Sequence, residues 1–122
     1  MTYRPLAAVI VVAVIGLAAG CQGEGPPLSP GAQLYVDKAC GNCHGQDREG
    51  KRTAPPLVDL ESHWGEDELV GYLGNPDAVT AAQPRLQVLS GEYPHRMPPV
   101  PEADENDLRV IARYLLEPRA DG

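Results

Sequence analysis

The sequence has little of what usually identifies the class of a small protein. It contains no phenylalanine and one tryptophan among 122 residues, so aromatic side chains can supply little of a hydrophobic core. No stretch alternates apolar and polar residues as a half-buried strand does, and we therefore expect an all-α fold. Basic residues are outnumbered, with a formal charge of -7 at pH 7, which argues against a nucleic-acid partner because phosphate binding needs basic side chains.

Cysteine is also scarce, and each of the three cysteines has a distinct place in the chain. Cys40 and Cys43 belong to a Cys-Gly-Asn-Cys-His segment that ends at His44, whereas Cys21 follows an apolar run over residues 6–19. None is left over for a structural disulfide. Stability must therefore come from helix contacts, prolines and a bound group.

The Cys-x-x-Cys-His spacing predicts covalent attachment of one haem c, with Cys40 and Cys43 as the thioether positions and His44 as an iron ligand. Two other sites use similar spacing. A redox dithiol is expected in a βαβ setting, and a zinc site needs a second pair of Cys or His residues. The sequence has neither feature, and an apolar haem would also add bulk to a thin core.

The N-terminus has the pattern of an export signal over residues 1–20, with Arg4 before the apolar run and small residues before Cys21. The run is shorter than the roughly 20 residues that a membrane-spanning helix needs. The segment resembles a bacterial lipoprotein precursor, although Leu17 stands one place earlier than the usual leucine. This resemblance implies lipidation of Cys21 and an exported, lipid-anchored protein on the periplasmic side of a bacterial membrane.

A Gly/Pro-rich linker is expected over residues 21–29, followed by one domain over 30–118 and a tail over 119–122. Ser29-Pro30 is a typical helix start, and we expect this first helix to reach Cys40. A short amphipathic helix is predicted over 66–73, stopped by Asn75-Pro76. The clearest helix has acidic residues near its start at 102–107, recurring apolar positions to Leu115, and an end before Pro118. Between these helices, residues 77–101 are predicted to form a long ordered loop with about one helical turn.

Residues from about 31 to 116 resemble a class I cytochrome c. This resemblance implies a small fold of three main helices around one covalent haem, with the first and last helices crossing. Gly31 and Tyr35 match the family's glycine and aromatic pair in the first helix. Ile111 and Tyr114 match their partners in the last helix.

The same resemblance implies a second iron ligand and several haem-pocket residues. Met97, in the segment Arg96-Met97-Pro98-Pro99, matches the family's methionine ligand, so the expected iron ligands are His44 and Met97. Either His95 or His63 is an alternative to Met97. Further expected haem contacts are the Pro55 carbonyl, which would accept a hydrogen bond from His44 Nδ1, and the side chains of Trp64, Tyr93 and Arg96.

These features predict an electron carrier rather than an enzyme: a membrane-tethered monohaem cytochrome c that transfers one electron at a time. Its partners would be redox proteins, with no small-molecule substrate and no nucleic acid. One alternative is a haem c subunit or module of a larger respiratory or oxidoreductase complex. Another is a haem sensor or enzyme with an open sixth iron position, which requires that Met97 does not bind the iron.

Overall fold

A computed structural model describes residues 25–119, and within that range the chain is helical and has no strand beyond an isolated antiparallel bridge between Lys51 and Ala54. The helices are α1 (Pro30–Asp37), α2 (Cys40–His44), the 3-10 helix η1 (Leu60–Ser62), α3 (Glu66–Gly74), α4 (Pro76–Ala82), α5 (Pro84–Glu92) and α6 (Glu105–Leu116). The predicted export signal, Cys21 and most of the tail lie outside the described residues.

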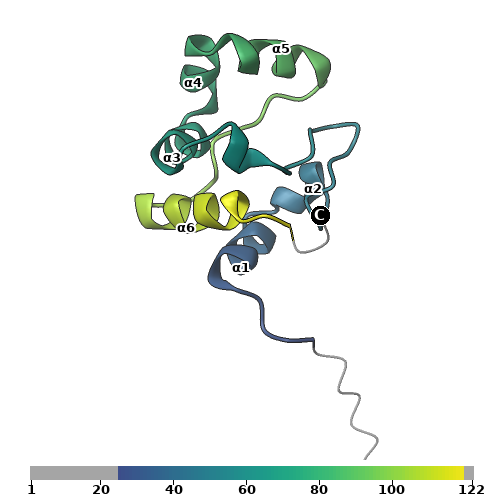
Figure 1. The fold of residues 1–122 in the computed structure, drawn as a ribbon, viewed down its shortest axis with the longest axis vertical. Coiled ribbons are helices and arrows are strands. Elements are labelled where there is room, and N and C mark those ends of the chain that lie inside the picture. The colour runs from purple at the N-terminus through teal and green to yellow at the C-terminus, as the bar shows by residue number, and fades with distance from the viewer. Residues whose placement is uncertain (1–24, 120–122) are drawn as a thin grey trace, which may run out of the picture.

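The core forms where α6 packs against both α1 and α3 (Figure 1). Gly31 lies directly against Tyr114, and the rings of Tyr35 and Tyr114 meet edge to face with centroids 5.8 Å apart. Ile111 is fully buried in the same region. The predicted all-α fold, with its first and last helices in contact, is confirmed.

Capping and charge explain where these helices begin. The Ser29 hydroxyl accepts a hydrogen bond from the Ala32 amide at 3.2 Å before α1, and the Asp104 carboxylate accepts one from the Asp107 amide at 2.8 Å before α6. The first turn of α3 holds three acidic residues, and their negative charges are stabilised by the positive end of the helix dipole. One of them, Glu66, lies 2.8 Å from Arg109 and 3.1 Å from Arg113, and these ion pairs join α3 to α6.

The first helix is shorter than predicted. It ends at Asp37 because Ala39 adopts a left-handed conformation, with φ of 59°, which an α-helix cannot include. A separate helix, α2, then begins at Cys40 and carries the whole Cys-x-x-Cys-His segment. The expectation of one continuous helix to Cys40 is therefore wrong.

The predicted long loop over residues 77–101 is also wrong, since much of it is helical. Asn75 ends α3 and caps the next helix, with its side chain accepting a hydrogen bond from the Ala78 amide at 3.3 Å. Pro76 is the first residue of α4, and Pro84 is the first residue of α5. Proline fits the first helical position because its missing N–H has no partner there, so these prolines start helices as Pro30 does.

The helices form a stack in which α4 and α5 lie above α3, α6 lies below α3, and α1 lies below α6 (Figure 1). The chain returns from α5 to α6 through an irregular segment over residues 93–104. This segment is tied to α3 by a 3.0 Å hydrogen bond from the Val100 amide to the Leu73 carbonyl. Within the described part of the chain, no helix has the length and apolar character needed to cross a membrane.

Candidate functional site

The short helix α2 is held by groups outside it. A five-residue helix is too short to be stable alone, because few hydrogen bonds offset the cost of starting a helix. Here four successive carbonyls, those of residues 42–45, each accept a hydrogen bond from beyond the helix. Their donors are, in order, Lys51 Nζ at 3.2 Å, Thr53 Oγ1 at 3.2 Å, the Gly50 amide at 2.7 Å and the Tyr35 hydroxyl at 2.7 Å.

Two free thiols lie three residues apart on α2, a spacing that places them on neighbouring positions of one helix face. Cys40 is partly buried against the hydrophobic core, whereas Cys43 is exposed. Burial raises the pKa of the Cys40 thiol, because the thiolate loses solvation there. The two sulfurs therefore occupy different environments, one at the core and one at the surface.

His44 is the last residue of α2, and its ring is buried, with 8% of its surface exposed. Its Nδ1 atom lies 2.8 Å from the Pro55 carbonyl oxygen. Burial lowers the pKa of His44, and the hydrogen bond to Pro55 partly opposes that effect. A neutral ring that donates from Nδ1 leaves the Nε2 lone pair for a metal, which is the usual arrangement of a histidine ligand.

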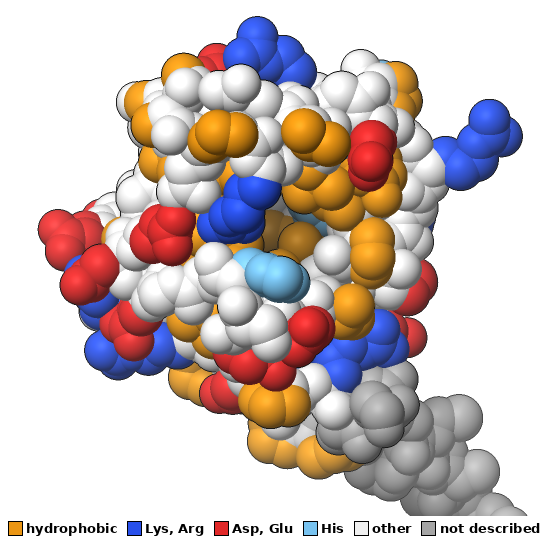
Figure 2. Space-filling model, turned by 45° about the horizontal axis from the view of Figure 1, so that its top comes forward, with side chains coloured by type: hydrophobic (Ala, Val, Ile, Leu, Met, Phe, Trp, Pro, Cys, Tyr) orange, Lys and Arg blue, Asp and Glu red, His pale blue; other side chains and the backbone are white. Residues whose placement is uncertain are grey.

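The thioether of Met97 belongs to the same apolar region as Cys40. Both side chains are partly buried and pack against the core cluster formed by α1, α3 and α6. Other partly buried apolar side chains against that cluster include Leu57, Leu60, Trp64, Tyr72 and Val100. Figure 2 shows a hollow on one face of the molecule, with hydrophobic side chains on its floor and basic and histidine side chains at its rim.

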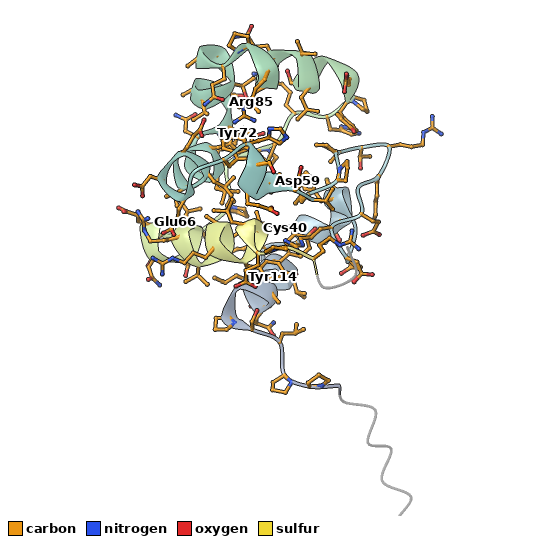
Figure 3. All side chains as sticks on the ribbon, in the orientation of Figure 1. Cys40, Asp59, Glu66, Tyr72, Arg85 and Tyr114 are labelled. Atoms are coloured by element: carbon orange, nitrogen blue, oxygen red, sulfur yellow. The ribbon has the colours of Figure 1, made fainter. Side chains whose placement is uncertain are left out.

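Trp64 packs against two side chains, Tyr72 and Arg85, that could not be identified as its partners from the sequence. Its ring centroid is 5.0 Å from that of Tyr72, and the Arg85 guanidinium lies 4.3 Å above the tryptophan ring. Arg85 also pairs with Glu68 at 3.5 Å and donates to the His63 carbonyl at 3.1 Å. Figure 3 shows Tyr72 and Arg85 on the side of α3 that faces α4. This stack joins the segment before α3 to the start of α5.

The remaining predicted residues differ in position. Arg96 forms an ion pair with Asp77 at 2.8 Å, and both side chains point into solvent, with 77% and 70% exposed. Tyr93 is partly buried, whereas His63 and His95 are exposed. The structure thus brings Cys40, Met97 and Trp64 to one apolar cluster and Pro55 to His44, but it does not bring Arg96 into this group.

The groups on α2 and those packed against the core cluster fit a c-type haem. They supply two free thiols, a histidine with its Nε2 available, a thioether and an apolar surface for a large flat ring. The donors from Lys51 and Thr53 were missed from the sequence, because nothing in a polar loop distinguishes a residue that caps a neighbouring helix from one that points to solvent.

Comparison with known proteins agrees with this geometry. The cytochrome c family model matches residues 28–117, a range that includes α1 to α6 and every residue of the site. No curated protein and no solved structure gives a significant match to the chain. On the family match, which covers most of the sequence, the chain belongs to the cytochrome c family.

Proposed function

We propose that this cytochrome c transfers single electrons between redox partner proteins by means of one haem c, attached through Cys40 and Cys43 and ligated by His44 and Met97. Membership of the family implies a covalent haem and an electron carrier. The observation that carries the finer assignment is the 2.8 Å contact between His44 Nδ1 and the Pro55 carbonyl. That contact orients the ring and leaves Nε2 as the nitrogen available to iron.

The proposed residues have separate roles in holding the haem, setting its reduction potential and lining its pocket. The haem supplies one-electron chemistry when bound. Cys40 and Cys43 would hold it covalently, and ligation by the Met97 thioether would favour the reduced state and raise the reduction potential. Trp64 and Tyr93, both partly buried, are the proposed pocket contacts. Arg96 is a weaker candidate for a haem contact, because its guanidinium is already paired with Asp77 at the surface.

We further propose that the protein is exported and tethered to the periplasmic side of a bacterial membrane through lipid on Cys21. The proposed division is a signal peptide over 1–20, a linker over 21–29, the haem domain over 30–118 and a tail over 119–122. Residues 25–29 lie outside any helix, and α1 begins at Pro30, which agrees with a linker up to that point. A tether of this length would keep the domain within about 30 Å of the membrane surface.

The iron ligands are tested by the optical spectrum of the purified holoprotein. We expect the weak ferric band that methionine-ligated cytochromes c show, and no rapid carbon monoxide binding in the reduced state. Met97→Ala should abolish that band, open the iron to carbon monoxide and lower the reduction potential, because a soft thioether ligand is lost. His95→Ala, in the same segment, is the matched control and should leave all three properties unchanged. Retention of the band in Met97→Ala would refute methionine ligation.

The tether is tested by mass spectrometry of the mature protein extracted from membranes. We expect a lipid-modified N-terminal Cys21, and a Cys21→Ser variant that is recovered in the soluble fraction. An unlipidated mature N-terminus would contradict the proposed anchor. It would leave the haem assignment intact, because Cys21 lies outside the domain that holds the site.

A further inference from the structure

Arg48 is a buried arginine, and charged side chains are seldom buried in proteins. It lies four residues after His44, and only 6% of its surface is exposed. Its backbone adopts the left-handed conformation, with φ of 60°, which is unfavourable for a side chain of this size. Both burial and backbone conformation cost free energy, so the contacts of this side chain must offset them.

The guanidinium of Arg48 binds the carbonyl end of α6. One nitrogen donates to the carbonyls of Tyr114 and Leu115, both at 3.2 Å, and to that of Glu117 at 3.4 Å. The other terminal nitrogen also donates to Glu117, at 3.4 Å, and the guanidinium carbon lies 4.9 Å from the centre of the Tyr114 ring. The last carbonyls of a helix have no partner within it and carry its negative dipole end, so a buried cation is stabilised there.

The backbone of Arg48 belongs to the segment that connects His44 to Pro55. Its carbonyl accepts a hydrogen bond from the Leu57 amide at 2.9 Å, which is two residues after Pro55. The segment folds back further through the 2.7 Å bond from the Gly50 amide to the His44 carbonyl. Gly50 itself packs so closely on Pro56 that a side-chain carbon there would lie 2.5 Å from the Pro56 nitrogen.

We propose that Arg48 is a positioning residue for the His44 ligand: by fixing the segment 45–57 to the end of α6, it holds the Pro55 carbonyl against His44 Nδ1. The Arg48 side chain binds the segment to α6, and the Arg48 carbonyl binds the Leu57 amide. Pro55 lies between Arg48 and Leu57 in the chain, so its carbonyl keeps its position relative to α2. Since donation from Nδ1 makes histidine a stronger ligand, Arg48 would act on the iron through His44. This role of Arg48 therefore rests on the proposed ligation of the iron by His44.

The test compares proton exchange in the reduced holoprotein by nuclear magnetic resonance. Arg48→Asn tolerates the left-handed backbone but cannot reach the α6 carbonyls. We expect the His44 Nδ1 proton and the Leu57 amide proton to exchange about tenfold faster in this variant, because charge-assisted hydrogen bonds are lost. Arg48→Lys keeps the charge and part of the reach, and should show a smaller increase at the same two protons.

Arg113→Gln is the matched control, since Arg113 lies on the last turn of α6 but pairs with Glu66 on α3. It should leave the exchange rates of both protons unchanged. The Val100 amide, which is bonded to α3, should exchange at the same rate in every variant. Unchanged exchange of the His44 proton in Arg48→Asn would overturn the inference, as would equal acceleration at Val100. A failure of the proposed ligation appears separately, in the haem spectrum of the unmodified protein.

The reduction potential of Arg48→Lys gives a second readout, because the charge near the site is kept. A weaker bond from His44 to Pro55 makes the histidine a weaker donor and destabilises the ferric state. We expect the potential to rise, with each tenfold change in the ratio of reduced to oxidised protein corresponding to about 59 mV. A potential equal to or below that of the unmodified protein would count against the inference.

Discussion

Gly31 is the residue whose replacement tests the core most directly. It lies on α1 where that helix meets α6, and a side-chain carbon added to it would lie 2.3 Å from Tyr114 Cβ and 3.0 Å from the Val110 carbonyl oxygen. Neither atom is the far end of a flexible side chain, so neither can move aside without its backbone. Gly31→Ala must therefore separate α1 from α6 by more than about 1 Å to reach ordinary contact distance.

The expected loss of stability follows from two opposing effects. Overpacking of a well-packed core costs about 1–3 kcal/mol, and here the separation also loosens Tyr35 and Ile111, which are almost fully buried. Alanine is favoured over glycine inside a helix by about 1 kcal/mol, which offsets part of that cost. We expect a net loss of up to about 2 kcal/mol, equivalent to a decrease in Tm of up to about 16 °C for a domain of this size.

Urea unfolding of the holoprotein, followed by circular dichroism, measures this difference. Gly71→Ala is the matched control, because Gly71 lies inside α3 and a carbon added to it meets nothing within 4 Å. The control should be unchanged or more stable by up to about 1 kcal/mol, since only the helix preference acts. If Gly31→Ala were as stable as Gly71→Ala, the close approach of α1 and α6 would not be what requires glycine at position 31.

Three further changes test other parts of the structure. Tyr35→Phe removes the hydroxyl that donates to the Gly45 carbonyl at 2.7 Å, and urea unfolding should show a loss of about 1 kcal/mol. Asp104→Ala removes the cap of α6 and should cost about 1 kcal/mol in the same assay. The two arginine hydrogen bonds of Glu66 lower its pKa below the ordinary 4.5, so its charged form stabilises the fold above that pH, and this stabilisation is lost as pH falls through the lowered value. Glu66→Gln should thus be less stable than the unmodified protein near neutral pH and equal to it in strong acid, and a constant difference across this pH series would contradict the assignment.

The contact between the first and last helices could be predicted from the sequence. In α6, apolar residues recur with helical spacing up to Leu115, and acidic residues precede them, so both the helix and its buried face are visible. Gly31 and Tyr114 then fit one another as the family resemblance implied. The last helix itself could be predicted because its signals are local in the chain and repeat along the helix, whereas its contact with the first helix was implied by the family resemblance.

The helices α4 and α5 could not be found in the same way. Pro76 was interpreted as a residue that stops α3, yet it is also the first residue of α4. Asn75-Pro76 and Ser29-Pro30 are the same type of start, a capping side chain followed by proline, so the signal was present. It was overlooked because α4 and α5 show little periodicity: each buries a single residue, Pro76 and Leu86 respectively.

The Cys-x-x-Cys-His segment could be recognised from the sequence because Cys40, Cys43 and His44 lie within five consecutive residues. The supporting groups could not be, with the exception of the Pro55 carbonyl. Arg48 looks like any other charge in a polar loop until the fold brings it to the end of α6. Side-chain donors to backbone carbonyls leave no pattern in a sequence, because the acceptor is the same at every position.

The hydrogen bond between the Val100 amide and the Leu73 carbonyl determines which segment of the domain can change in length. The chain leaves α3 at Asn75 and returns to the last turn of the same helix at Val100, so α4 and α5 form an excursion whose two ends meet. Met97 lies three residues before the return point. Its position is therefore set from the anchored end, and the excursion can lengthen or shorten at small entropic cost while the thioether stays against the core.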